Sequence, residues 1–156
     1  MTEFKWYEGI EIHKVYLSAI LNLCERGIES YMLRDSNDNK LVLDTFDLAL
    51  EHDPVATPIF HNDCGFQYTN NIFHRKLVDR GMVQSMSRVV HCIDNGSMEG
   101  FWGVLKLECY YVRRFTSRES LVQTIEQYID YYSNQRIQRS LNILKPMEVW
   151  AMKLAA

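Results

Sequence analysis

Apolar and polar residues alternate along the first third of the chain, as they do in strands that bury one face. The alternation runs through EFKWY (3–7), KVYLSAILNL (14–23) and GIESYML (27–33), which are rich in aromatic and β-branched side chains. Gly9 and Gly27 punctuate these runs and suit tight turns. The pattern therefore predicts three strands joined as an antiparallel meander.

The spacing of apolar residues becomes helical after the segment SNDNK (36–40). The positions that follow this helical spacing are Leu41, Val42, Thr45, Phe46, Leu48 and Ala49. Asn37 or Asp38 can cap the start of the helix, because either side chain can accept a hydrogen bond from a free N–H group of the first turn. Pro54 cannot continue a helix, so we expect the helix to end near His52.

Short strands and helices alternate through the rest of the chain. We predict strands at 56–63 and 82–87, a loop at 88–93, and helices at 70–81, 94–112, 117–136 and 145–150. Gly81 closes the first of these helices, and Pro146 lies in the first turn of the last. The order of elements predicts an α/β fold with one mixed five-stranded sheet and helices on both faces, in a single domain over residues 1–156.

Length and composition limit the class of protein. A chain of 156 residues with 47% hydrophobic content is long enough for one domain with a substantial core. The longest apolar run, VYLSAILNLC (15–24), is too short to span a bilayer, and residues 1–15 lack the charged-then-apolar pattern of a leader. We therefore expect a cytoplasmic protein with no membrane partner.

The cysteines are spread along the chain. Cys24, Cys64, Cys92 and Cys109 form no Cys-x-x-Cys pair, which favours reduced thiols over a zinc site or a disulfide scaffold. His91 stands beside Cys92 without a second paired ligand motif, so we expect no metal site there.

Charge is distributed unevenly along the sequence. The net charge is −3, but residues 100–156 carry 8 Lys and Arg against 5 Asp and Glu, a balance of +3 that leaves −6 for residues 1–99. An acidic part with a metal site and a basic part that holds phosphates would produce this pattern, and so would two solvated faces of an ordinary domain.

Two acidic residues stand at positions suited to chemistry. Asp63 ends the strand predicted at 56–63, and Glu99 lies in the first turns of the helix predicted at 94–112. Taken alone, Asp63 fits a turn before Gly65, and Glu99 fits the preference of helix starts for acids. A helical wheel places Glu99 at the margin of the apolar face and Lys106 two turns below it on the same side. A metal-binding acid and a phosphate-binding cation on one face would suit a DNA site.

Three segments around these acids resemble the integrase-core domain of bacterial insertion-sequence transposases, a family related to retroviral integrases. The segments are HNDCGFQYTNNIF (61–73), QSMSRVVHCIDNGSMEGFWGVLKLE (84–108) and YIDYYSNQRIQRSLNILKPMEV (128–149). The resemblance extends from Thr2 to about Trp150, and the stretch DNGSMEGFWGVLK, with thirty-five residues between its acid and the strand-end acid, is very specific.

The resemblance implies a ribonuclease-H-like fold in which three acids hold two Mg²⁺ or Mn²⁺ ions. Asp63 corresponds to the second acid and Glu99 to the third, and both are implied to be catalytic. Ions held in this way activate a water or a DNA 3′-hydroxyl and stabilise the leaving oxygen, so the implied activity is DNA strand cleavage and transfer. The implied partners are DNA, at the element's ends and at the target, and further copies of the chain, with a dimer as the first expectation.

Basic and aromatic residues of the second half are further candidates. The residues that we expect to contact DNA are Asn95, Lys106, Arg113, Arg114, Arg136 and Arg139. The tyrosines that we expect to pack in the core, rather than to stack on bases, are Tyr110, Tyr111, Tyr128, Tyr131 and Tyr132.

The start of the sequence bears on the acid set. The family's first acid lies in the first strand just ahead of a Thr-Glu-Phe like Thr2–Phe4, and this sequence starts with Met1 at the next position. The resemblance therefore implies that the first acid, and the upstream region that recognises the element's ends, are absent. Glu3 cannot replace it, because strand alternation points Glu3 to the opposite face. We expect a weak or inactive transposase core. The alternative is an inactive remnant that binds DNA or dimerises and interferes with an intact transposase.

Overall fold

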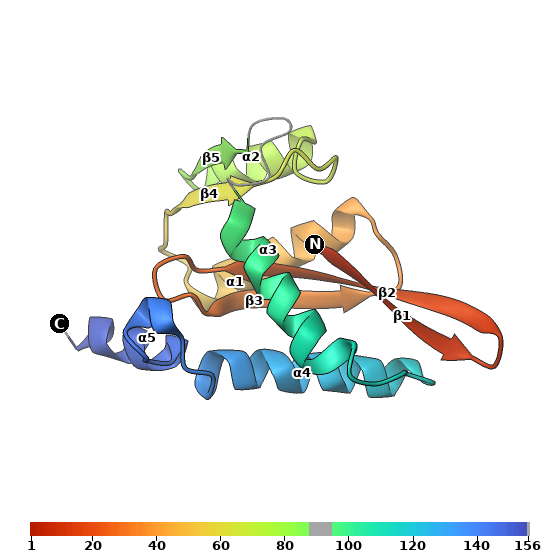
Figure 1. Cartoon of the computed structure of the whole chain (residues 1–156). Helices are drawn as coiled ribbons and strands as arrows, with labels where there is room; N and C mark the ends of the chain where they lie inside the picture. The colour runs from red at the N-terminus through yellow and green to blue at the C-terminus, as the bar shows by residue number, and fades with distance from the viewer. Residues whose placement is uncertain (88–94, 156) are drawn as a thin grey trace.

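The computed structural model describes residues 1–87 and 95–155, and begins with the predicted antiparallel meander. Strands β1 (Thr2–Glu8), β2 (Glu11–Leu21) and β3 (Ile28–Arg34) pair in that order. Gly9 has a φ of 60° at the turn between β1 and β2, a conformation that glycine adopts without strain. This hairpin extends well beyond the end of β3 (Figure 1).

Two further strands form a separate sheet. Strands β4 (Ile59–Asn62) and β5 (Val83–Met86) are parallel, and helix α2 (Asn71–Asp79) connects them. The expected single five-stranded sheet is therefore wrong in this detail, because the five strands pair as three plus two. The outer edge of β1 forms hydrogen bonds with the segment that follows α3. Lys5 N–H donates to the Tyr110 hydroxyl and Tyr7 N–H donates to the Phe115 carbonyl, both at 3.0 Å.

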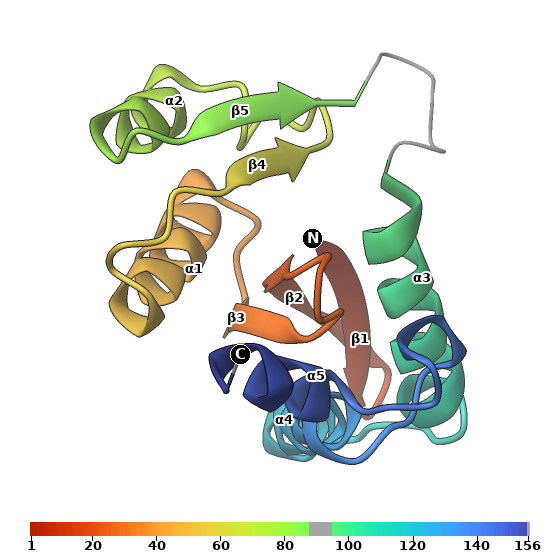
Figure 2. The ribbon, with the colours of Figure 1, turned by 90° about the vertical axis from the view of Figure 1, so that its left-hand side faces the viewer.

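Helices cover both faces of the three-stranded sheet, as expected. Figure 2 shows α1 (Asn39–His52) on one side of the sheet, with α3 (Gly96–Leu105) and α4 (Arg118–Asn134) on the other. The larger core lies between the sheet and these last two helices. It includes Phe4, Val15, Leu17, Phe101, Leu105, Leu121 and Ile125. A smaller core joins α1 to the β4–α2–β5 unit through Phe46, Leu50, Phe73 and Leu77.

The helix ends follow the sequence. The Asp38 carboxylate accepts a hydrogen bond from Leu41 N–H at 2.9 Å, so Asp38 is the cap of α1, which ends at His52 as predicted. The last helix, α5 (Pro146–Leu154), has Pro146 in its first turn and runs four residues further than predicted. The predicted loop at 88–93 and the start of the helix at Asp94 lie outside the described residues.

The helix predicted at 94–112 is broken near its end. Helix α3 passes directly into η2 (Lys106–Tyr110), a π-helical turn, and a short 3-10 turn, η3 (Arg139–Leu141), follows α4. The apolar pattern did not predict either turn, because a change in hydrogen-bond spacing leaves the buried face nearly unchanged. Phe101, Leu105 and Cys109 are all buried across the junction.

The tyrosines divide between core and surface. Tyr128 and Tyr132, one turn apart on α4, are buried, and Tyr110 is half-buried. The expectation of core packing is wrong for Tyr111 and Tyr131, whose side chains are 65% and 41% exposed. Tyr111 follows the last residue of η2, where the chain leaves the core. Among the described cysteines, Cys24, Cys64 and Cys109 are free thiols.

Candidate active site

Three chain segments that are distant in sequence approach one another at one end of the molecule. In Figure 2 the start of β1 lies between the end of β4 and the first turns of α3. Asp63 directly follows β4, and Glu99 lies in the first turn of α3. The two predicted acids are therefore carried by elements that flank the start of β1.

Asp63 is both a turn residue and an exposed acid. Its carboxylate oxygen Oδ1 accepts a hydrogen bond from Gly65 N–H at 2.9 Å, which closes a tight turn directly after the strand. A Cβ atom at position 65 would lie only 2.8 Å from that oxygen. Glycine at this position therefore lets the carboxylate sit against the backbone, and the turn holds Asp63 in place.

The charge of Asp63 acts on neighbouring groups. Burial lowers the pKa of the Met1 α-amino group, Asp63 raises it, and Lys106 lowers it further. Burial and the Asp63 carboxylate raise the pKa of Tyr68 to about 12. Asp63, Lys106 and the start of β1 therefore share one electrostatic environment.

Glu99 and Lys106 lie on the same side of the helix. They are seven residues apart, which is close to two full turns and about 10 Å along the axis. The Lys106 ammonium lies 5.6 Å from the ring centre of Phe4, a core residue of β1. Glu99 is exposed, and no described side chain forms a salt bridge with it. Its carboxylate is therefore available on the side of α3 that faces β1.

The alternation of β1 is consistent with the sequence-based view of Glu3. Phe4 is fully buried against α3, whereas the Glu3 carboxylate accepts a hydrogen bond from the Lys14 ammonium at 3.0 Å. Because side chains alternate along a strand, a residue directly ahead of Met1 would point to the same side as Thr2 and Phe4, toward α3. That is also the side that carries Glu99 and Lys106.

The donor atoms fit a hard divalent cation in type. Carboxylate oxygens suit Mg²⁺, which commonly uses one or two carboxylates and keeps several waters. Within residues 1–87 and 95–155, no three or more His, Cys, Asp or Glu side chains are grouped so that they could bind a metal ion together. The described chain therefore offers a two-carboxylate site at most at this end of the molecule.

The residues expected to contact DNA are divided between several places. Asn95 precedes α3, and its side chain makes no capping hydrogen bond. Arg113 and Arg114 follow η2 at the opposite end of the helix and are exposed, as is Arg139 in η3. Arg136 forms a salt bridge with Glu108 at 2.7 Å. Lys106 and Asn95 thus accompany the acids, whereas the four arginines do not.

One group of polar residues beside Asp63 was not predicted. His61 on β4 lies 3.0 Å from the Ser85 hydroxyl through Nδ1 and 3.1 Å from the Ser87 hydroxyl through Nε2. The Ser87 carbonyl oxygen also accepts a hydrogen bond from the Cys64 thiol at 3.0 Å. The parallel register that pairs His61 with Ser85 could not be read from sequence, because four-residue strands carry little information on pairing.

Comparison with known proteins supports the resemblance. A family model described as the integrase core domain matches residues 99–154. A transposase-like protein of Haemophilus influenzae is 41% identical over 94% of this chain and 66% of its own length. The transposase for insertion sequence element IS904 of Lactococcus lactis is 33% identical over 86% of this chain and 54% of its own length. The chain belongs to the integrase-core family.

Solved structures agree with this family at the level of the fold. The HTLV-2 integrase catalytic core domain, in complex with magnesium, superimposes with a TM-score of 0.64 at 11% identity, over 95% of this chain and 91% of that one. A chain of the simian T-cell lymphotropic virus intasome gives a TM-score of 0.68 at 12% identity, over 88% and 48%. This integrase core therefore has the ribonuclease-H-like fold implied by its sequence.

The integrase core described here spans about half to two thirds of the length of the two bacterial relatives. None of the helices in the described part of the chain is both long and apolar enough to cross a membrane.

Proposed function

We propose that this chain is the catalytic core of a transposase that cuts and joins DNA strands, with Asp63 and Glu99 as its metal-binding acids. The observation that supports this best is the placement of two available carboxylates, one after β4 and one in the first turn of α3, around the start of β1. The magnesium complex of the HTLV-2 core supports a divalent cation in proteins of this fold.

Each residue has a distinct task in this proposal. A bound Mg²⁺ or Mn²⁺ would supply Lewis-acid activation of the scissile phosphate and of the attacking hydroxyl. The Gly65 N–H holds the Asp63 carboxylate at the end of β4. Lys106 places a positive charge beside the acids that can attract a DNA phosphate, and the Asn95 amide can donate a hydrogen bond to the same strand.

The proposed role of the two acids is tested by adding a third carboxylate beside them. A residue added directly ahead of Met1 would point toward α3, so an extension by Met-Asp brings a carboxylate to the acid site. An extension by Met-Asn has the same length and shape without the charge. The assay is nicking of a supercoiled plasmid in Mn²⁺, together with the thermal shift that each protein shows on adding Mn²⁺.

The proposal predicts the order of the nicking rates of these proteins. The Met-Asp form is expected to nick at least about a hundredfold faster than the unextended chain and the Met-Asn form, since a metal contributes several kcal/mol to the transition state. Asp63→Asn or Glu99→Gln in the Met-Asp form should abolish both the nicking and the metal-dependent thermal shift. Equal nicking by the Met-Asp form and its Asp63→Asn variant would refute the role of Asp63.

A second candidate function is a core that binds DNA or dimerises without cutting DNA. It is supported by the acid set, because the described residues hold no group of three metal-ligating side chains. Such a protein would compete with an intact transposase for DNA ends or for partner subunits. Sedimentation equilibrium tests the proposed dimer, and a monomer at all concentrations, with no binding to duplex DNA, would exclude this function.

A further inference from the structure

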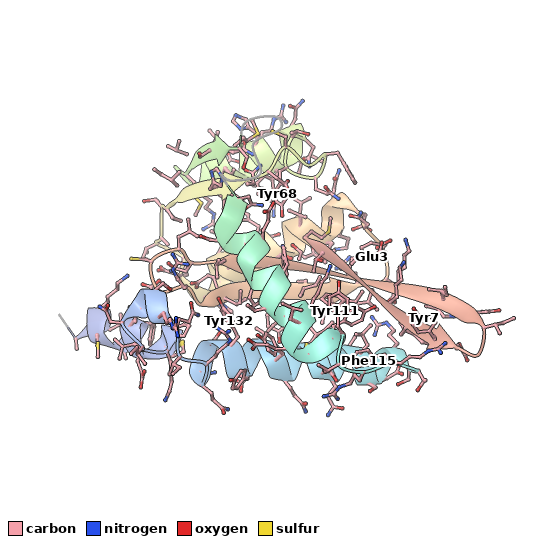
Figure 3. The ribbon with its side chains drawn as sticks, viewed as in Figure 1. Glu3, Tyr7, Tyr68, Tyr111, Phe115 and Tyr132 are labelled. Carbon is pink, nitrogen blue, oxygen red and sulfur yellow. The ribbon has the colours of Figure 1, made fainter. Side chains whose placement is uncertain are left out.

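A pocket of about 470 Å³ lies at the opposite end of the α3–η2 helix from the acids. Its walls come from β1, from the end of η2 and from the loop that follows. They include Lys5, Tyr7, Tyr111, Arg113, Arg114 and Phe115. Figure 3 shows Tyr7, Tyr111 and Phe115 gathered between β1 and the end of the helix. The pocket is therefore built by segments about a hundred residues apart in the sequence.

The pocket is positively charged. Lys5, Arg113 and Arg114 contribute three cations, and none of the described residues that line it is acidic. In the part of the chain that the structure describes, no carboxylate forms a salt bridge with either arginine. The Arg114 guanidinium lies 4.4 Å from the ring centre of Tyr7, and that of Arg113 lies 6.0 Å from the ring centre of Phe115. Stacking on rings steadies both guanidiniums and leaves their N–H groups free to meet an anion.

The pocket also offers an aromatic surface. Tyr111 is 65% exposed, and its ring centre lies 5.3 Å from that of Tyr110. Tyr110 is fixed to β1, because its hydroxyl accepts a hydrogen bond from Lys5 N–H at 3.0 Å and donates one to the Lys5 carbonyl at 3.2 Å. An exposed ring on a fixed support, beside two arginines that form no salt bridge with a described carboxylate, is the combination that binds single-stranded nucleic acid.

We propose that this pocket binds one unpaired nucleotide of a DNA strand, with the base on Tyr111 and the phosphates on Arg113 and Arg114. The inference rests on the proposed function, since it takes DNA to be the substrate. Tyr111 is twelve residues beyond Glu99 on the same helix, a distance of about 18 Å along the axis. That distance corresponds to about five base pairs of duplex at 3.4 Å each. The pocket thus holds the strand about five nucleotides from the site of cutting.

The test separates the base from the phosphates. The chain is titrated into two fluorescein-labelled decamers in EDTA, one of deoxythymidine and one of abasic sites with the same phosphates. Wild type is expected to prefer the thymidine decamer about tenfold. Tyr111→Ala should remove this preference and leave the affinity for the abasic decamer unchanged. Arg113→Gln with Arg114→Gln should weaken binding of both decamers and reduce the slope of log K against log salt by about 1.4.

A matched control removes two positive charges elsewhere. Lys40 and Lys145 each pair with an acid on the surface, so Lys40→Gln with Lys145→Gln is expected to bind both decamers nearly as wild type does. Equal losses in the control and in the arginine variant would overturn the proposal, as would a base preference that survives Tyr111→Ala. Because these titrations need neither metal nor Asp63, their failure leaves the plasmid-nicking test intact, and the reverse also holds.

Discussion

The contact between Gly65 and Asp63 shows how one residue can control the candidate acid. A Cβ atom at position 65 would meet the Asp63 carboxylate at 2.8 Å, whereas a Cβ atom at Gly100, next to Glu99, would meet nothing within 4 Å. Both glycines adjoin an acid, but only Gly65 supports one through its backbone N–H. The two positions therefore form a matched pair for mutagenesis.

We predict that Gly65→Ala weakens metal binding and Gly100→Ala does not. The Gly65→Ala methyl group displaces the Asp63 carboxylate, and loss of a supporting contact of this kind typically costs about tenfold or more in metal affinity. Gly100→Ala should instead raise the stability of α3 by up to about 1 kcal/mol. Both effects are measured by thermal melting of the Met-Asp form over a Mn²⁺ titration. Equal metal responses in the two variants would contradict the role given to the Gly65 contact.

A salt bridge joins η2 to the segment that directly follows α4. The Glu108 carboxylate accepts hydrogen bonds from Arg136 at 2.7 Å and from the Tyr128 hydroxyl at 2.7 Å. The Arg136 guanidinium, and to a smaller extent the Tyr128 hydroxyl, hold the pKa of Glu108 below its usual value. Arg136 is thus engaged within the protein, and its contact with DNA stays a prediction that would require this pair to open.

The depressed pKa of Glu108 predicts a loss of stability in acid. Because the folded state favours the ionised carboxylate, the contribution is fully present above the unfolded pKa of about 4.3 and is lost as pH falls through the lower folded pKa. Glu108→Gln should therefore be less stable than wild type at pH 7, by about 1 kcal/mol for a pair this exposed, and the difference should shrink as the pH falls below about 4.3.

Urea unfolding between pH 7 and pH 3 measures this difference. Glu126→Gln on α4 is the control, because no described residue forms a salt bridge with Glu126, and its stability relative to wild type should vary less with pH. A constant difference between wild type and Glu108→Gln across this range would show that the carboxylate charge contributes nothing.

Individual strands and helices were easier to predict from the sequence than the contacts between them. Alternation predicted β1 to β3. The cap expected at Asn37 or Asp38 and the first-turn Pro146 predicted two helix starts, because these signals depend on neighbouring residues only. The pairing of β4 with β5, and the use of the Tyr110 hydroxyl to bond the edge of β1, depend on residues far apart in the chain. Local sequence patterns do not encode such contacts, so these features could be identified only from the structure.

The same distinction applies to the candidate site. Asp63 and Glu99 were found through the family resemblance, since each has an ordinary explanation as a turn or helix-start residue when taken alone. The pocket around Tyr111 was missed, because a tyrosine after an apolar helical run is usually buried. Only the end of η2, where the chain turns away from the core, makes Tyr111 a surface residue.

At the scale of the whole molecule, helix α1 links the β4–α2–β5 unit to the three-stranded sheet. On one side the Ser30 hydroxyl of β3 donates a buried hydrogen bond to the Thr45 carbonyl at 2.7 Å. On the other side the ring centre of Phe46 lies 5.5 Å from that of Phe73 on α2. Because α1 packs against both units, we expect the chain to unfold as the single domain that its length and composition predict.

This cooperativity is tested by disturbing one core and observing the other. Phe73 is fully buried in the smaller core, whereas Trp6 and Trp102 pack against the larger one. Phe73→Ala should cost about 3 to 5 kcal/mol. In a single cooperative unit, it should also lower the midpoint of the tryptophan fluorescence transition by about 10 °C. Phe66→Ala, at a position that is 61% exposed in the same segment, should leave that midpoint nearly unchanged.

The outcome distinguishes two ways in which the acid site could lose its geometry. If the tryptophan midpoint moves with Phe73→Ala, β4 and Asp63 cannot detach without unfolding the sheet, and the acids keep their relative positions up to the melting temperature. A tryptophan midpoint that stays fixed, while far-UV circular dichroism shows an earlier transition, would mean that the β4–α2–β5 unit melts alone. In that case Asp63 would leave Glu99 well below global unfolding, and any metal-dependent nicking would disappear at the temperature of the earlier transition.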